Sequence, residues 1–364
     1  MKKRIMILGK IPPPYMGPSI ATQIILESSL KERFELLHID TRVNTSLDTM
    51  GRFSLSKIIR SISIWIKMFT TILTKRPALV VIPISQSTAG YLKDLIFILI
   101  AKITFRKTLI HLRGSNFRNW LNSSSAFTRF FVTTTLKMNN GVIVLGNNLK
   151  QLFSGIFSGK NIYVCPNGGN YSIPASSRKD SDVRILYLAN LQPSKGIEDV
   201  LNAIKKLKTR IASGYTLVVV GSWRSKIVEE SCIKLVTENN LPVVFLPPAT
   251  GDDKFQHLAD ADIFVFTPRE PEGHPWVIVE AMAAGLPIIS TDKGAIIESV
   301  NDGINGYIVP SGDPDAIAER LHKLITEPGL RSAMSVASKK AYQNGFTEEK
   351  MVGNLTTIFE KVIN

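Results

Sequence analysis

Two glutamates eight residues apart, Glu272 and Glu280, are the side chains whose surroundings most favour chemistry. Glu280 is the only ionisable residue in the apolar segment 275–286, whose proline in the first turn and Gly285 at the end predict a helix. Burying an unpaired carboxylate costs several kcal/mol, so Glu280 must protonate, meet a cation or accept hydrogen bonds from hydroxyl groups. A ribose diol supplies two such donors.

Glu272 lies in the loop that enters this helix. Before the loop, residues 263–266 form a short apolar run that ends near Pro268 and predicts a buried strand. Gly273 exposes backbone amides beside the helix N-terminus, where the helix dipole favours an anion such as a phosphate. This turn of the chain is therefore expected to meet a sugar, a phosphate and a ribose together.

The arrangement resembles the Glu-x7-Glu signature of retaining glycosyltransferases, specifically glycosyltransferase family 4 with its GT-B fold. The neighbouring segments EAMAAGLPII and DGINGYIVP also match, and the resemblance covers essentially the whole chain. It implies that Glu272 contacts the hydroxyls of the donor sugar and that Glu280 holds the nucleotide ribose. The alternative is an exposed loop glutamate followed by a salt-bridged helix glutamate.

The loop departs from the family pattern Glu-Gly-Phe-Gly, because His274 and Pro275 stand at its third and fourth positions. Pro275 removes one amide donor, so a phosphate cradle at Gly273, His274, Pro275 and Trp276 has fewer backbone contacts. His274 either adds a side-chain contact or packs, and packing or shaping of the loop is favoured.

A second cradle is expected at Lys195-Gly196, which resembles the family segment Gly-Arg-x4-Lys-Gly, whose two cations bind the donor diphosphate. Asn190 replaces the arginine, so Lys195 is the one matched cation. Two phosphates and one lysine leave a charge deficit that Arg113 or another basic residue is expected to fill. The alternative for Lys195 is a solvated lysine at a helix start.

Three residues of the first half extend the resemblance. Gly17 matches the glycine-rich loop that reaches the donor diphosphate or the acceptor, although a rigid strand-to-helix turn explains it equally well. The segment HLRGS resembles His-x-His-Gly, with Arg113 in place of the second histidine. Arg113 is expected to stabilise the leaving phosphate or to grip an anionic acceptor. His111 either acts beside it or, as is commoner for a lone strand histidine, points into the sheet core.

Strands and helices alternate in both halves, which predicts an α/β fold with two doubly wound, Rossmann-like domains facing a cleft. The polar stretch 173–181 reads as the linker between an acceptor-binding domain, 1–172, and a domain for the nucleotide-sugar donor, 182–345. The resemblance implies that the last segment, 346–364, carries a helix that returns to the first domain.

The formal charge of +14 is unevenly distributed, since residues 1–180 carry +18 and residues 181–364 carry −4. Such a basic half attracts nucleic acid, anionic lipid or a phosphorylated substrate, and no nucleic-acid motif is found. Residues 54–75 form a basic amphipathic helix, with apolar positions Ile58, Ile62, Trp65, Ile66 and Phe69 on one face and Lys57, Arg60 and Lys67 on another. It fits either an anionic bilayer surface or an ordinary sheet-packed helix.

The two cysteines are widely spaced and predict neither a disulfide nor a metal framework, which favours a reducing, cytoplasmic compartment. The apolar run LIFILIA is too short to span a bilayer, and the first apolar run is too short for a signal peptide. No metal or cofactor is expected besides a UDP- or GDP-type sugar donor.

The prediction is a retaining, metal-independent glycosyltransferase that moves a sugar from a nucleotide diphosphate to an acceptor hydroxyl. The acceptor is expected to be a lipid-linked glycan at the inner face of the plasma membrane, in the synthesis of bacterial surface polysaccharide. Two alternatives remain open: a sugar-nucleotide epimerase of the same fold, and a non-catalytic nucleotide-sugar-binding protein of the membrane surface.

Overall fold

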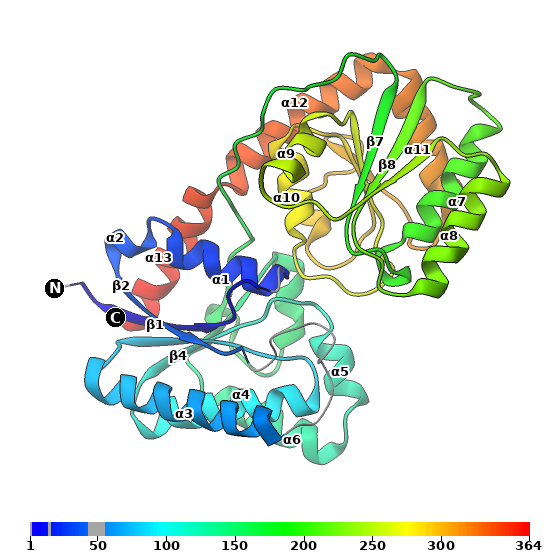
Figure 1. The fold of residues 1–364 in the computed structure, drawn as a ribbon. Helices are drawn as coiled ribbons and strands as arrows, with labels where there is room; N and C mark the ends of the chain where they lie inside the picture. The colour runs from blue at the N-terminus through cyan, green and yellow to red at the C-terminus, as the bar shows by residue number, and fades with distance from the viewer. Residues whose placement is uncertain (1, 14–15, 43–54) are drawn as a thin grey trace. The chain divides into compact units, whose positions relative to one another are not determined.

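A computed structural model describes residues 2–13, 16–42 and 55–364, with side chains from residue 58 onward in the last range. The chain divides into two compact units (Figure 1). Unit 1 comprises Met1–Gly169 and Glu348–Asn364, and unit 2 comprises Asn170–Thr347. The expected end of the first domain, 172, lies three residues after Gly169, and the expected return at 346 lies two residues before Glu348. The predicted linker, 173–181, falls within unit 2.

The elements of unit 1 are β1 (Arg4–Gly9), α1 (Gly17–Glu27), α2 (Leu30–Arg33), β2 (Glu35–Asp40), α3 (Leu55–Lys75), β3 (Leu79–Pro83), α4 (Thr88–Ile103), β4 (Lys107–His111), α5 (Phe117–Ser123), α6 (Ala126–Lys137), β5 (Gly141–Val144), the 3-10 helices η1 (Asn147–Phe153) and η2 (Gly159–Asn161), β6 (Ile162–Val164) and α13 (Glu348–Ile363).

Unit 1 is built on a parallel sheet of order β2-β1-β3-β4-β5-β6. The strands are parallel because a helix returns the chain between most of them. Helices α1, α2 and α13 lie on one face, and α3, α4 and α6 lie on the other (Figure 1). The strand order reverses between β1 and β3, so the crevice at their carboxyl ends is where an open α/β sheet binds ligands.

The elements of unit 2 are β7 (Val183–Leu188), the 3-10 helix η3 (Pro193–Lys195), α7 (Ile197–Lys208), β8 (Tyr215–Val220), α8 (Lys226–Glu238), β9 (Val243–Leu246), α9 (Gly251–Ala259), β10 (Ile263–Phe266), α10 (Trp276–Ala283), β11 (Ile288–Ser290), the 3-10 helix η4 (Ile296–Glu298), β12 (Gly306–Ile308), α11 (Pro314–Thr326) and α12 (Pro328–Gly345).

Unit 2 has a parallel sheet of order β12-β11-β10-β7-β8-β9, which reverses between β7 and β10. Alternate residues of β7 enter two separate apolar cores: Ile185 and Tyr187 pack with α7, α8 and α11, whereas Leu186 and Leu188 pack with α9 and α10. A strand covered on both faces reads as a continuous apolar run, which is why the sequence identified it. The predicted pair of doubly wound, Rossmann-like sheets is confirmed.

Helix α3 has one buried and one exposed apolar face. It is anchored to unit 1 through Met68 and Ile72, which are fully buried. The apolar stripe that ordinary packing would bury is instead largely exposed, at Ile58, Ile62 and Ile66. Helix α3 thus packs on unit 1 through Met68 and Ile72 and leaves most of the predicted apolar stripe exposed.

Candidate active site

The predicted donor residues other than Gly17 belong to unit 2. Because all its strands are parallel, the loops after β7, β8, β9, β10 and β11 leave from the same, carboxyl edge. Lys195 follows β7, Glu272 follows β10, and these two strands flank the point where the strand order reverses. The topology therefore gathers the predicted residues where ligands bind in doubly wound sheets.

Glu280 lies in the middle of α10 and is buried, with 3% of its surface exposed. The helix is short and apolar on nearly every side because it fills the space between the sheet and α12. Lys254 Nζ, from α9, donates to Glu280 Oε1 at 2.6 Å. Of the three fates open to a buried carboxylate, the structure shows the second, a cation.

Lys254 is thus a residue that the sequence analysis missed. It lies 26 residues before Glu280 on a helix, α9, that the sequence pattern did not reveal. Its ammonium also sits 4.9 Å from the centre of the Phe255 ring. Tyr171 packs against Phe255, and its buried hydroxyl has no hydrogen-bond partner among the described residues. Burial, together with the charge of Glu280, raises the pKa of Tyr171 well above its usual value.

Lys195 and Glu272 form an ion pair through Nζ and Oε1, so the expected diphosphate contact and the expected sugar contact are neighbours. The loop that carries Lys195 is bound to β7, since the hydroxyl of Tyr187 donates to the Lys195 carbonyl oxygen at 2.9 Å. It is also tied to the loop after β10, because the Arg269 amide donates to the Ser194 carbonyl oxygen at 3.0 Å. The ion pair and these two contacts join the loop after β7 to the loop after β10.

The loop of Glu272 and Gly273 rests on the turn after β11. The Ala295 amide donates to the Gly273 carbonyl oxygen at 2.7 Å. Gly294 has a φ of +60°, and a Cβ there would lie 2.0 Å from the Glu272 carbonyl oxygen. Only glycine allows this approach, so Gly294 is a further positioning residue of the site.

His274 and Pro275 shape this loop. His274 is buried; its Nε2 lies 2.6 Å from the hydroxyl of Ser299, and its ring packs on Phe346. Burial lowers the pKa of His274 to about 3, so the ring is neutral at physiological pH and brings no charge to a phosphate. Pro275 is the N-cap of α10, and the buried Trp276 is its first residue.

Asn190, which stands where the resembled family has an arginine, forms a hydrogen bond with Arg224. Its Oδ1 accepts hydrogen bonds from Arg224, at 3.1 Å, and from the hydroxyl of Ser222, at 3.4 Å. Both donors belong to the loop after β8, which backbone bonds join to Leu191. Arg224 is exposed, and it brings a positive charge next to Asn190.

Gly17, His111 and Arg113 belong to unit 1. Gly17 is the first residue of α1, at the carboxyl edge of the sheet. His111 ends β4 and is buried, but its Nε2 has no hydrogen-bond partner among the described residues, so it is not the satisfied core histidine that is usual in a strand. Arg113 follows in the next loop, and burial lowers its pKa to about 10, which leaves it charged at neutral pH.

Within the described ranges, no group of three or more His, Cys, Asp or Glu side chains is arranged to hold a metal ion. The site of unit 2 instead contains two lysine–glutamate ion pairs, Lys195–Glu272 and Lys254–Glu280. Its ion pairs can open toward a ligand that carries both anionic groups and hydroxyl donors.

Part of the chain is similar in sequence to known glycosyltransferases. Residues 172–341, nearly all of unit 2, match the family described as "Glycosyl transferases group 1". The capsular polysaccharide biosynthesis glycosyltransferase CapM of Staphylococcus aureus is 30% identical over 176 residues, which are 48% of this chain and 44% of CapM. N-acetyl-alpha-D-glucosaminyl L-malate synthase of Bacillus anthracis is 28% identical over 188 residues, 50% of this chain and 47% of that protein. The chain spans about half the length of these curated relatives.

The fold extends the likeness over the whole chain. The crystal structure of Anabaena HepE in complex with UDP matches with a TM-score of 0.77 at 16% identity, covering 99% of this chain and 100% of HepE. Such low identity shows the fold alone. The GT-B architecture of two Rossmann-like domains is therefore shown, whereas membership of family 4 in particular stays a prediction.

Proposed function

We propose that this chain, which has the GT-B fold and whose residues 172–341 match the group 1 glycosyl transferases, is a glycosyltransferase that uses a nucleotide-diphosphate sugar. The observation that carries the proposal is the buried carboxylate of Glu280 in an apolar helix, at the edge where Lys195 and Glu272 meet. HepE, with the same fold, has been crystallised with UDP and with UDP-glucose, which supports a donor of this class.

Each donor group has a matching residue. The ribose diol donates to Glu280, which exchanges part of its contact with Lys254 for two hydroxyl donors. Lys195 and Arg224 bring two positive charges to the diphosphate, and the N-terminus of α10 adds its dipole. Glu272, released from Lys195 by the phosphate, accepts hydrogen bonds from the sugar.

The reaction proposed is substitution with retention. The bond between the anomeric carbon and the diphosphate oxygen breaks, and the acceptor oxygen bonds to that carbon on the same face. The leaving diphosphate takes the acceptor's proton. The protein contributes positioning and charge stabilisation, without a metal, in keeping with the family that the sequence resembles.

The stereochemistry provides the test. We expect the full chain, incubated with UDP-glucose, UDP-N-acetylglucosamine or GDP-mannose, to hydrolyse one of them slowly when water replaces the acceptor. Proton NMR should then show the α-anomer of the sugar before mutarotation. Release of the β-anomer first would refute retention. Conversion of the donor to its epimer with no nucleotide released would favour the epimerase, and binding without turnover would favour a non-catalytic protein.

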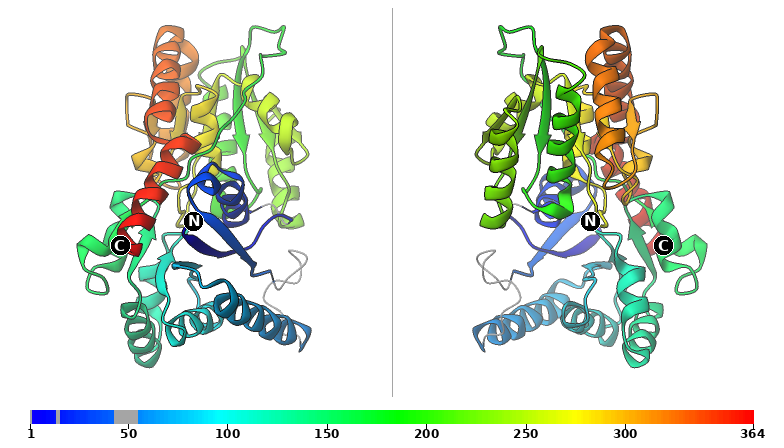
Figure 2. Two further views of the ribbon diagram at one scale, coloured as in Figure 1. Left: turned by 90° about the vertical axis from the view of Figure 1, so that its left-hand side faces the viewer. Right: turned by 90° about the vertical axis from the view of Figure 1, so that its right-hand side faces the viewer.

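The acceptor proposed is a lipid-linked glycan at the inner face of the membrane, and the surface of unit 1 supports it. Figure 2 shows α3, α4 and α6 in one row on the same face of the sheet. The exposed apolar side chains of α3, between 37% and 61% accessible, are Ile58, Ile59, Ile62, Ile66, Phe69 and Leu73. Those of α4, α6 and the turn after α4 are Leu92, Leu99, Ile103, Phe105, Phe127 and Phe130.

Exposed apolar surface of this extent marks an interaction site. Cations lie among these side chains, at Arg60, Lys67 and Lys75 of α3 and at Arg129 of α6, in a half of the chain that carries +18. An apolar stripe flanked by cations fits the headgroup region of an anionic bilayer. No described helix is both long and apolar enough to cross a bilayer. We therefore propose peripheral binding through this face.

We expect the full chain to sediment with phosphatidylglycerol vesicles at low salt, and less with phosphatidylcholine vesicles or at high salt. Replacing Ile59 and Ile66 by serine should weaken this binding about tenfold or more, because the bilayer would no longer bury two exposed isoleucine side chains. The matched control is Ile227→Ser, an exposed isoleucine on α8 of unit 2, which should have no effect.

Undiminished binding of the double variant would contradict the α3 face as the membrane contact. If the wild-type protein does not bind vesicles but forms a dimer, and the double variant stays monomeric, the face binds a second copy of the chain instead.

A further inference from the structure

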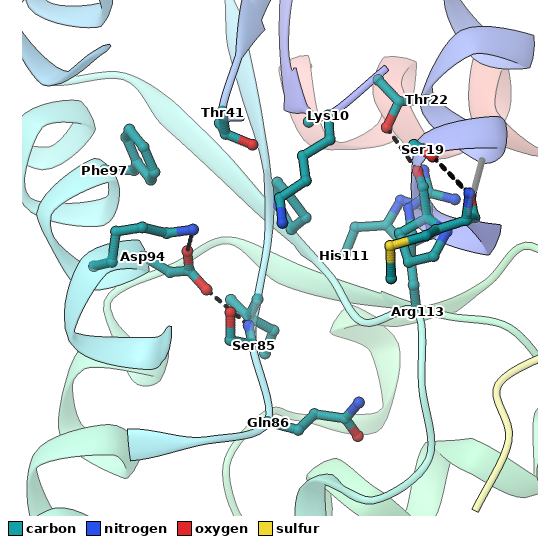
Figure 3. Close-up of a pocket in the computed structure, with 16 residues that line it drawn as sticks. Lys10, Ser19, Thr22, Thr41, Ser85, Gln86, Asp94, Phe97, His111 and Arg113 are labelled. Carbon is teal, nitrogen blue, oxygen red and sulfur yellow. Dashed lines mark hydrogen bonds and ion pairs between the residues drawn. The ribbon is translucent and has the colours of Figure 1, made fainter. Parts of the chain in front are cut away.

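Unit 1 contains a cavity that the donor site does not account for. It has a volume of about 260 Å³ and lies at the carboxyl ends of β1, β3 and β4, where the strand order of this unit reverses (Figure 3). The N-terminal turn of α1 and the second turn of α4 close it. A doubly wound sheet binds its ligand in this position.

Positive charge dominates the cavity wall. Lys10, Lys93 and Arg113 line it, against a single carboxylate, Asp94. Asp94 is already engaged, because its Oδ2 accepts from the Ser85 amide at 2.7 Å and its Oδ1 lies 3.4 Å from Lys93 Nζ. The wall therefore has a net positive charge.

Lys10 and Arg113 have no hydrogen bond or ion pair with any residue that the structure describes. Burial, followed by repulsion from Lys93, lowers the pKa of Lys10. Asp94 and Asp40 act on Lys10 in the opposite direction, but neither forms an ion pair with it. An anion in the cavity would therefore be attracted by the charges of both Lys10 and Arg113. The geometry thus leaves room for a negative ligand.

His111 gives an independent indication. It is 4% exposed and lines the cavity, and its Nε2 has no partner within the described part of the chain. A buried polar atom without a partner destabilises the fold, and a hydrogen bond to a ligand atom would remove that cost. Burial and the charge of Arg113 lower the pKa of His111, so the ring is neutral and can donate one N–H. Figure 3 shows His111, Arg113 and Lys10 among the side chains that line the cavity.

We propose that this cavity binds a phosphate or diphosphate group of the acceptor, with Lys10, Lys93 and Arg113 as counter-ions and Nε2–H of His111 as a neutral donor. The assignment of this phosphate to an acceptor rests on the proposed function. The volume is slightly below the ~300 Å³ at which pockets for drug-sized ligands begin, so it suits a headgroup or one phosphorylated sugar rather than an oligosaccharide. Whether a lipid diphosphate or a soluble sugar phosphate supplies the group is left to the test.

The test is calorimetric titration of the full chain with inorganic pyrophosphate in the presence of saturating UDP or GDP, whichever binds. We expect pyrophosphate to bind at a site that the nucleotide does not block. Lys10→Met and Arg113→Met should each weaken it roughly 10- to 100-fold, the loss that one charge-assisted hydrogen bond represents. Lys150→Met, which removes an exposed charge of unit 1 away from the cavity, should leave it unchanged.

Complete displacement of pyrophosphate by the nucleotide, or equal affinity in all three variants, would overturn the proposal. His111→Phe, with circular dichroism to verify folding, serves as a second variant and should weaken binding without altering the charge. If neither UDP nor GDP binds while pyrophosphate still binds at Lys10, the donor hypothesis fails and the cavity stands, so the two failures are distinguishable.

Two further ligands identify the source of the phosphate. Farnesyl diphosphate binding more tightly than pyrophosphate would assign the cavity to a lipid diphosphate. Glucose 6-phosphate binding more tightly than inorganic phosphate would assign it to a soluble sugar phosphate. Absence of binding by all four compounds would refute an anion site.

Discussion

Replacing Glu280 by glutamine is expected to weaken binding of the nucleoside diphosphate by about 2–4 kcal/mol, roughly 30- to 700-fold, because two hydroxyl donors lose a charged acceptor. The substitution keeps the shape of the side chain inside α10. It frees Lys254, which is 18% exposed and able to turn its ammonium toward water. The fold should therefore survive, and isothermal titration with UDP and GDP measures the loss.

Lys254→Met is the matched control, because it removes the other half of the same ion pair. It leaves a carboxylate buried without a cation, which costs about 3–5 kcal/mol, so its melting temperature should fall further than that of Glu280→Gln. Its nucleotide affinity should fall less. If Glu280→Gln binds the nucleotide as tightly as wild type while both variants lose equal stability, the ion pair is structural only and the ribose role is wrong.

Gly294→Ala is expected to abolish most donor binding from a position that touches no donor. The added Cβ would meet the carbonyl oxygens of Glu272 and Gly273 at 2.0 and 2.3 Å. Because these atoms are backbone, the loop must move, and Glu272 moves with it. This displacement and the positive φ of residue 294 should together cost about 2–4 kcal/mol of stability. We expect nucleotide binding to weaken at least tenfold.

Gly312→Ala separates the effect of the positive φ from the effect of the contact between the added Cβ and the Glu272 loop. Gly312 has a φ of +76°, but a Cβ there meets nothing within 4 Å. It should lose only about 1 kcal/mol of stability, the penalty of a left-handed backbone, with donor affinity unchanged. Equal effects of the two variants on affinity would show that contact between the turn and the Glu272 loop is not what positions the site.

Much of the fold followed from the sequence because burial on both faces of a parallel sheet leaves a simple pattern. The strand 263–266 and the helix after it were located by an apolar run, a proline and a glycine, and the structure has β10 at Ile263–Phe266 and α10 at Trp276–Ala283. The unusual carboxylate of Glu280 was visible for the same reason, since a single charge is conspicuous in an apolar helix.

The partners of the site residues were not visible, because they depend on which strands are neighbours. Lys254 and Arg224 are ordinary surface-type residues in the sequence, and each reaches the site only through the sheet order β10-β7-β8-β9. A search for basic residues within a few positions of each strand end would have included Arg224, which follows the end of β8 closely, but not Lys254, which lies inside α9. The exposed stripe of α3 was ambiguous for another reason, as periodicity identifies an apolar face but not what covers it.

The most direct test of the central claim, that the edge of unit 2 holds the ribose of a nucleotide donor, is saturation-transfer NMR on the full chain with UDP and GDP. We predict that one of them receives saturation, most strongly at its ribose protons, and that Glu280→Gln removes the ribose signal. Absence of saturation transfer to both nucleotides, or a ribose signal that persists in Glu280→Gln, would contradict the account.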